Sequence, residues 1–305
     1  MLRRSLPIGA VAISIPMVAV AFAGSAQAPT PHVSVVPLNP PQDTIYIASG
    51  STGSNNGIII GKTGVILIDT GVSTAAEQLE LDEIAKITSK PITTAIITHS
   101  DADHVTGLAV LPPLITIIAQ ENCKKEMEAA ANAPLRGAAP SGPRPQIPLP
   151  TNTIDTKAAM TIDGVRFEFL HVAPAHTSGD LMTYLPDEKT VFTGDIIADN
   201  TPYPIIHLEK NGSSEGWIES VTGLVKFDAN TFVPGHGAVH TKAEIEQRLA
   251  SVKERRAEIQ SLVLQGKSLD EIKQQLGETT PAAGGRGPRF PSFTDVVYRE
   301  LTTKN

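Results

Sequence analysis

The stretch Ala95-Ile96-Ile97-Thr98-His99-Ser100-Asp101-Ala102-Asp103-His104 decides the fold. An apolar, β-branched run, typical of a buried strand, ends in four potential metal ligands within six residues. Side chains that follow the carboxyl end of such a strand lie above a sheet edge, where open α/β folds place their chemistry. Histidine and aspartate are good ligands for divalent ions. A polar turn in which one Asp caps the next helix would need neither histidine, so the stretch favours a metal site.

Length, charge and cysteine content limit the classes of protein to which this chain can belong. The chain has 305 residues, of which 41% are hydrophobic and 19% charged, and its formal charge is −7 with no basic block. The length suits one large domain or two small ones, and the spread negative charge argues against nucleic acid as a partner. The single cysteine, Cys123, excludes an intramolecular disulfide framework and a cysteine-rich zinc module. Any metal must therefore be held by histidine and carboxylate.

The N-terminus is typical of a signal peptide covering residues 1–28. Two arginines precede an apolar run at 8–23, and Ala26-Gln27-Ala28 fits the small-x-small cleavage rule. We expect a mature chain that begins near Pro29, is exported to the periplasm or secreted, and has no stable membrane insertion after cleavage. An uncleaved membrane anchor is the alternative, which the shortness of the apolar run disfavours.

The next part of the chain alternates predicted strands and helices. We expect strands at 44–49, 57–60, 65–69, 95–98 and 114–119, and helices at 74–89 and 121–131. Strand, helix, strand at this spacing predicts a βαβ unit. The turn-rich segment 51–57 could overhang a site. Asp69, which follows an apolar strand, is expected to be structural and to bond loop amides near the metal loop.

The second half adds three more potential ligands. We expect a hairpin at 160–162 and 165–171, strands at 181–185, 190–192 and 231–233, and helices at 214–226, 241–265, 268–276 and 293–301. His176, Asp195 and His236 each lie in a glycine-rich loop next to a predicted strand. Loops at strand ends can converge on one site even when they are far apart in sequence.

Together these motifs resemble the metallo-β-lactamase-fold hydrolase superfamily. The resemblance runs from about residue 44 to 240 and rests on four motifs: His99-x-Asp101-x-Asp103-His104, His176-Thr-x-Gly-Asp, Thr193-Gly194-Asp195 and Pro234-Gly235-His236-Gly237. It implies an α/β fold, a four-layer αββα sandwich with a dinuclear site at one edge of its sheets. The chain would then comprise a signal peptide (1–28), the hydrolase domain (29–240) and C-terminal helices (241–305) with a flexible Gly/Pro-rich segment at 278–291.

The resemblance also implies a ligand set. The first metal would be held by His99, Asp101 and His176 and the second by Asp103, His104 and His236, with Asp195 bridging. Asp103 would in addition orient the attacking hydroxide. The superfamily usually carries His where this chain has Asp101, and a carboxylate there resembles the flavodiiron branch, which carries Glu. Two zinc ions remain the favoured cofactor, but the harder donor makes iron or manganese stronger alternatives.

The function implied is a metal-dependent hydrolase of a small molecule. A hydroxide from the dinuclear site would attack an ester, thioester or amide-like bond. A di-iron oxidoreductase in the same cage, β-lactam hydrolysis as a side or main activity, and a metal-binding protein without turnover are the alternatives. His207 and Tyr203, which follow Asp195 in the chain, are candidates for substrate contact; otherwise His207 is a surface or packing histidine.

Overall fold

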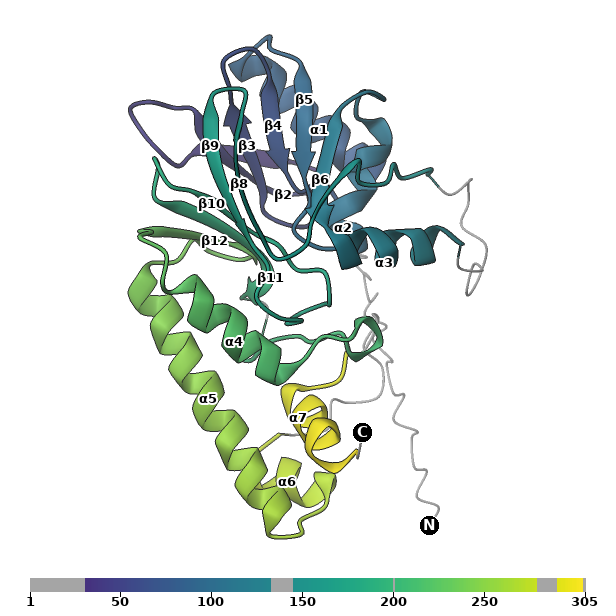
Figure 1. The fold of residues 1–305 in the computed structure, drawn as a ribbon, viewed down its shortest axis with the longest axis vertical. Helices are drawn as coiled ribbons and strands as arrows, with labels where there is room; N and C mark the ends of the chain where they lie inside the picture. Colours follow the sequence, from purple (N-terminus) through teal and green to yellow (C-terminus); the bar gives the residue numbers. More distant parts are fainter. Residues whose placement is uncertain (1–30, 133–144, 200, 279–289, 304–305) are drawn as a thin grey trace, which may run out of the picture. The chain divides into compact units, whose positions relative to one another are not determined.

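Two β-sheets form the centre of the structure, a computed structural model that describes residues 31–132, 145–199, 201–278 and 290–303 (Figure 1). The signal peptide predicted at 1–28 and most of the Gly/Pro-rich segment predicted at 278–291 lie outside the described residues. In the first sheet the strands follow chain order: β1 (Val33–Pro37), β2 (Ile45–Gly50), β3 (Asn56–Ile60), β4 (Val65–Ile68), β5 (Ile92–Ile96), β6 (Thr116–Gln120) and β7 (Asn152–Ile154). In the second sheet they run β12 (Thr231–His236), β11 (Thr190–Ala198), β10 (Met182–Leu185), β9 (Val165–Leu170) and β8 (Lys157–Ile162).

Strand direction changes part-way across the first sheet. Strands β1 to β4 pair antiparallel, whereas β4 to β7 pair parallel. Helix α1 (Thr74–Ile87) makes the crossover between β4 and β5, which confirms the predicted βαβ unit. Parallel pairing places the carboxyl ends of β4 and β5 side by side, so the loops that follow both strands lie at one edge of the sheet.

Alternating side chains of the strands feed different cores, because successive residues of a strand point to opposite faces. In β4, Ile66 and Ile68 pack between the two sheets against residues such as Phe167 and Phe192 of the second sheet. Val65 of the same strand instead packs on the outer face, in a cluster shared with the helices. The sheets therefore pack face to face with helices outside, as expected for the αββα sandwich.

Helices cover the outer face of each sheet (Figure 1). On the first sheet lie α1, α2 (Ala102–Val105), the 3₁₀ turn Thr106–Val110 and α3 (Glu121–Asn132). On the second lies α4 (Ser214–Leu224), followed by α5 (Lys242–Leu264), and the helices α6 (Leu269–Gln275) and α7 (Phe293–Thr302) pack on α5 farther from the sheet. The buried Trp217 of α4 donates from Nε1 to the Ile196 carbonyl at 2.6 Å and joins a cluster that includes Phe232 of β12 and Val296 of α7. The C-terminal helices thus share a core with the second sheet, and the domain boundary expected at residue 240 stays a prediction.

Several strands differ from the sequence-based expectation. The strand expected at 231–233 continues to His236, so His236 ends β12 and does not lie in a loop after it. β1 lies in a Pro-rich stretch for which the sequence predicts only extended chain. Its pairing with β2 is a tertiary contact that no local pattern indicates. β7 has three residues, too few for a periodic signal. The strand expected at 190–192 continues to Ala198, so Asp195 lies inside β11 rather than in a loop after it. Its pairing with β12 shifts register around Gly194, so the strand does not have one regular pattern along its whole length.

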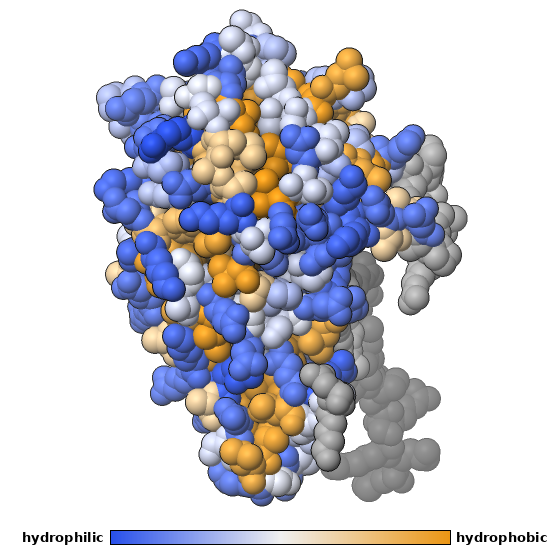
Figure 2. Space-filling model, in the orientation of Figure 1, coloured by the Kyte–Doolittle hydropathy of each residue, from blue (hydrophilic) through white to orange (hydrophobic). Residues whose placement is uncertain are grey.

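The face shown in Figure 2 is mixed: hydrophilic side chains are the more frequent, and apolar side chains lie among them down its middle and at its lower end. Among the helices of the described residues, none combines the length and the apolarity needed to cross a membrane.

Candidate metal centre

The loop after β5 presents four donor residues at the edge of the first sheet. His99 and His104 are buried, whereas Asp101 and Asp103 are partly exposed. Asp101 occupies the N-cap position of α2, but among the described residues its side chain makes no capping hydrogen bond. The interpretation of this stretch as a simple helix cap is therefore wrong. The carboxylate of Asp101 faces the histidines instead.

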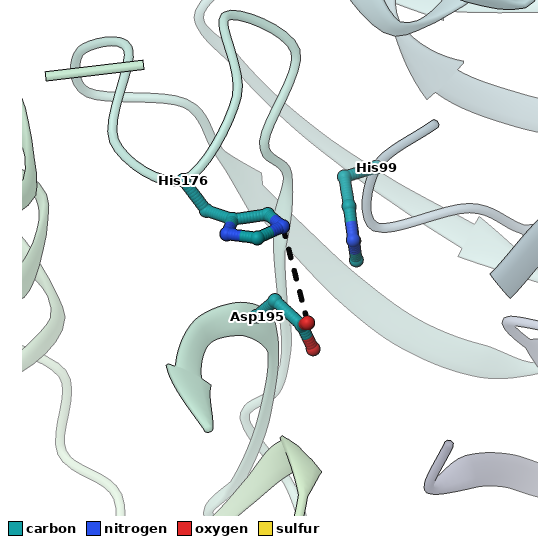
Figure 3. Close-up of side chains that lie close together, drawn as sticks. All are labelled: His99, His176 and Asp195. Carbon is teal, nitrogen blue, oxygen red and sulfur yellow. Dashed lines mark ion pairs between the residues drawn. The ribbon is translucent and has the colours of Figure 1, made fainter. Parts of the chain in front are cut away.

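The second sheet supplies the other donors at the adjoining edge. His176 lies in the loop after β9, Asp195 in β11 and His236 at the end of β12. Figure 3 shows His99, His176 and Asp195, which come from three separate segments, facing one another. Gly235 allows β12 to lie close to Asp195 of β11, because a Cβ there would lie 1.8 Å from Asp195 Oδ1. All seven predicted donors are thus brought together at one sheet edge.

One half of the cluster consists of Asp103, His104 and His236, whose donor atoms all lie within 4.8 Å of one another. His236 Nε2 is 3.2 Å from Asp103 Oδ2 and 3.3 Å from Asp195 Oδ2. His104 Nε2 is 3.4 Å from Asp195 Oδ1. Asp195 therefore contacts two histidines of this half through separate oxygens. We refer to Asp103, His104 and His236 as the second half.

The other half consists of His99, Asp101 and His176 and centres on the carboxylate of Asp101. We refer to it as the first half. Asp101 Oδ2 is 3.3 Å from His176 Nε2 and 3.8 Å from His99 Nε2. The imidazole of His207 also enters, with Nε2 at 3.2 Å from the same oxygen. Asp195 reaches this half too, with Oδ2 at 3.9 Å from His176 Nε2. Asp195 therefore lies between the halves.

Comparison with known proteins identifies the family. The model of the metallo-beta-lactamase superfamily matches residues 50–236, which is more than half of the chain. The chain belongs to the metallo-β-lactamase superfamily.

Relatives of this superfamily member carry several activities. It is 24% identical over 284 residues to a linear primary-alkylsulfatase from Pseudomonas sp. (strain ATCC 19151), covering 78% of this chain and 52% of the relative. It is 28% identical over 180 residues to a 2,4-dinitroanisole O-demethylase subunit alpha from Nocardioides sp. (strain JS1661), covering 58% and 51%. The chain therefore spans about half the length of these two relatives. Superfamily members are mostly hydrolytic enzymes.

A solved structure of the same fold is a metallo-beta-lactamase from Pontibacter korlensis. The TM-score is 0.59 at 21% identity, and the match covers 73% of this chain and 99% of that one. This likeness confirms the fold predicted for the superfamily.

The donor atoms of this superfamily member fit divalent metals. His99 Nε2, His104 Nε2 and Asp195 Oδ1 are buried and have no hydrogen-bond partner among the described residues. A buried polar atom without a partner costs free energy, and three of them pointing at one place fit cations that would bind there. Imidazole and carboxylate donors suit zinc, and also iron or manganese. That these residues bind a metal stays a prediction.

Asp69 holds the loop that carries His99 and His104 in place, as predicted. Its Oδ1 accepts from the Thr98 amide at 2.8 Å and its Oδ2 from the Thr98 hydroxyl at 2.7 Å. The same Oδ2 lies 2.9 Å from Nδ1 of His104. A carboxylate on the far nitrogen orients a histidine and makes the other nitrogen a better ligand.

The segment expected to overhang the site instead supports it from within. Thr52 and Asn56 are fully buried. The Ser54 hydroxyl donates to the Asp103 carbonyl at 2.8 Å, and Asn55 Nδ2 donates to the Pro234 carbonyl at 3.0 Å. These bonds join the Asp103 loop and β12, which carry two donors of the second half.

Carboxylates and imidazoles of the cluster strongly perturb one another. Burial lowers the pKa of His176, but Asp101 and Asp195 outweigh it and raise this pKa to about 9. Burial likewise opposes charge on His236, yet Asp103 and Asp195 raise its pKa to about 10. Burial would raise the pKa of Asp101, but the imidazoles of His176 and His99 hold it far below its usual range. Strongly shifted pKa values gathered in one cluster are typical of functional sites.

The two residues predicted to contact substrate lie in different surroundings. His207 is buried beside Asp101 and His176. Tyr203 packs against Phe293 of α7, with ring centroids 5.7 Å apart, and lies under the Arg255 guanidinium. That either contacts substrate stays a prediction.

Lys210, which no sequence pattern indicates, contacts a donor directly. Its Nζ donates to Asp101 Oδ1 and, at 2.8 Å, to the Ser100 hydroxyl. No local pattern marks this lysine, because its partner lies 109 residues away in the chain.

Proposed function

We propose that this protein is a metal-dependent hydrolase that cleaves an ester, thioester or amide-like bond in a small molecule. The observation that supports it is the convergence of seven His and Asp donors, some with buried atoms that lack a partner among the described residues. When bound, a pair of divalent ions in such a site lowers the pKa of a bound water and polarises the bond to be cleaved.

The chain's own residues would bind the ions and orient the attacking water. Asp103 is the most exposed donor, with 33% of its side chain accessible, and His236 follows with 19%. The open side of the cluster therefore lies at the second half. A carboxylate at this opening can accept a hydrogen bond from a water and orient it toward a substrate. The buried His99, His104 and His176 would keep the site rigid.

The names of the relatives broaden the substrates to test. Purified protein loaded with zinc would be incubated with each of five substrates: an aryl ester, a thioester, a β-lactam, an alkyl sulfate and an aryl methyl ether. We expect turnover of at least one, lost in Asp103→Ala, whose fold should persist because this side chain is partly exposed. The exposed Asp187→Ala is the matched control and should leave turnover unchanged. Turnover that persists in Asp103→Ala, or none on the whole panel, would contradict the proposal.

A di-iron oxidoreductase is the second candidate, because Asp101 replaces the usual histidine and makes the donor set harder. Metal analysis of protein purified without added metal separates the two. Zinc supports hydrolysis, whereas two irons with a visible absorption band support redox chemistry.

We also propose that the chain is exported, on the evidence of residues 1–28. Mass spectrometry of the exported protein should give an N-terminus at Pro29 or within a few residues of it. Soluble cytoplasmic protein with Met1 intact would contradict this.

A further inference from the structure

The first half lacks the second histidine of the usual motif, yet an imidazole from another segment lies beside Asp101, the residue that replaces it. His207, from a different segment, brings its Nε2 to 3.2 Å from Asp101 Oδ2. Asp101, His176 and His207 have donor atoms that all lie within 4.8 Å of one another, a spacing that ligands of one ion can span. The rings of His176 and His207 meet edge to face, with centroids 4.7 Å apart.

His207 is held as a ligand histidine is held. Its Nδ1 lies 2.5 Å from Glu209 Oε1, so that the far nitrogen has a carboxylate partner and Nε2 is directed at the cluster. His104 has the same arrangement with Asp69, and His176 has it with the Ile205 carbonyl at 2.8 Å. Metal-binding histidines nearly always use their second nitrogen in this way.

The backbone fixes His207 beside His176. The His207 amide donates to the His176 carbonyl at 2.9 Å, and the Ser178 amide donates to the Lys210 carbonyl at 2.8 Å. Gly212 allows the two segments to approach, since a Cβ there would lie 2.4 Å from the His176 carbonyl oxygen. His207 therefore keeps a defined place and is not a surface histidine that happens to be near the site.

Lys210 decides which oxygen of Asp101 faces the imidazoles. Its ammonium contacts Oδ1, whereas Oδ2 faces the imidazoles of His176, His207 and His99. The lysine charge also offsets the negative charge that aspartate adds where a neutral histidine is usual.

We propose that His207 is a metal ligand that completes the first half together with Asp101 and His176, and that Lys210 is a positioning residue for Asp101. This inference rests on the proposed metal dependence of the function, but not on hydrolysis. It assigns to His207 a role other than the two considered from the sequence, substrate contact and a surface or packing histidine.

Cobalt(II) titration of the full chain, stripped of metal, tests the proposal, because the visible absorption of cobalt reports its number and type of ligands. We expect wild type to bind two ions. In His207→Ala, the affinity for one ion should fall by at least about 10–100-fold, the loss seen even for residues that only support a ligand. The visible spectrum of the remaining complex should change.

A matched control is His240→Ala. This histidine also pairs with a carboxylate, at 2.9 Å from Asp199 Oδ1, but it lies outside the donor groups of the described residues. Its cobalt affinity and spectrum should equal those of wild type.

A second variant covers the case in which His207→Ala does not fold. In His207→Gln the amide can still donate to Asp101 Oδ2. If His207 has only a structural role, glutamine should therefore substitute for it with no change in cobalt affinity or spectrum. If His207 is a metal ligand, the cobalt spectrum of His207→Gln should differ from that of wild type, because the nitrogen donor is gone. Wild-type cobalt binding in either variant, including the case where only KM rises, would overturn the proposal.

Failure of this inference is separable from failure of the proposed function. The titration uses no substrate. Protein that binds two ions through His207 but hydrolyses nothing would contradict the hydrolase alone, and hydrolysis with an unchanged cobalt spectrum in His207→Ala would contradict the ligand alone.

Discussion

The two halves of the donor cluster contain the same residue types but are supported in different ways. The second half is supported by regular structure: Asp69 at the end of β4 holds His104, and His236 ends β12. The first half is supported by loops, since His176 depends on backbone bonds to the segment 205–212. The departure from the usual motif, Asp101, lies in the half that is supported by loops. Such a half can exchange a ligand without disturbing the sheets.

Asp195 joins the halves, and its removal should have the largest effect. In Asp195→Ala, His104, His236 and His176 all lose a carboxylate neighbour. We expect the loss of both metals, and a fall in turnover of at least about 10²–10³-fold, the scale of removing one fixed electrostatic group. Metal analysis and initial rates check this. Two ions retained at wild-type affinity would show that the halves are independent.

Asp69→Asn should weaken the second half selectively. The amide of Asn can replace only one of the two acceptor oxygens that serve Thr98 and His104. We expect the affinity for one ion to fall by about 10–100-fold, the usual cost of removing such a partner. The control is Asp163→Asn, since Asp163 also bonds loop amides, those of Thr63 and Gly64. Equal loss in both halves would mean that their supports are shared.

Metal affinity should rise with pH in both halves. An imidazole must lose its proton to bind a metal, and without metal the pKa values are about 9 for His176 and about 10 for His236. Below these values each site releases protons on binding, so affinity should rise by up to about tenfold per pH unit for each proton released. The rise should end at lower pH in the first half than in the second. Chelator competition from pH 6 to 10 measures it, and a flat profile would contradict it.

The same pKa values predict the stability of the metal-free protein. Both are raised above the ordinary histidine value of 6.5, so the folded state binds these protons more tightly than the unfolded state does. The stabilisation is complete below about 6.5 and is lost as the pH rises through about 9 and 10. Thermal melting of stripped protein should therefore show a falling Tm above neutral pH, which added metal reverses.

Asp101→His should have the smallest effect and makes the first half like the usual motif. A neutral imidazole replaces an anion, so the bound metal becomes a stronger Lewis acid. We expect the acid limb of the pH–rate profile to move downward by up to about one unit, and zinc to be preferred more strongly over iron or manganese. The control is Asp101→Asn, which removes the charge without adding an imidazole. An unchanged metal count in Asp101→Ala would show that Asp101 is not a ligand.

Pattern and motif were enough to predict much of this site. The apolar run before His99 indicated a buried strand with donors at its end, and β5 followed by the donor loop confirms that geometry. Asp69 was predicted as a structural residue from its place after a strand, and its bonds to Thr98 bear this out. The local pattern works here because Ala95, Ile96 and Ile97, which directly precede the donor loop, are fully buried and form a short apolar run.

Other features depend on contacts that no local pattern encodes. Strand β1 exists because it pairs with β2, and Asp195 lies within β11 because pairing with β12 resumes beyond Gly194. Lys210 reaches Asp101 only through the fold. A lysine in a polar loop has the same sequence signal whether it faces solvent or a buried carboxylate.

The sequence by itself determined the type of chemistry: histidine and aspartate at strand ends, no cysteine pair, and motifs in the order of one superfamily. Only the tertiary structure decided which donors face each other, that His207 joins Asp101 and that Lys210 occupies its other oxygen. The physical reason is one of range. Residue type and periodicity act over a few neighbours, whereas the position of a donor atom to within an ångström is set by the packing of two sheets and the loops bonded between them.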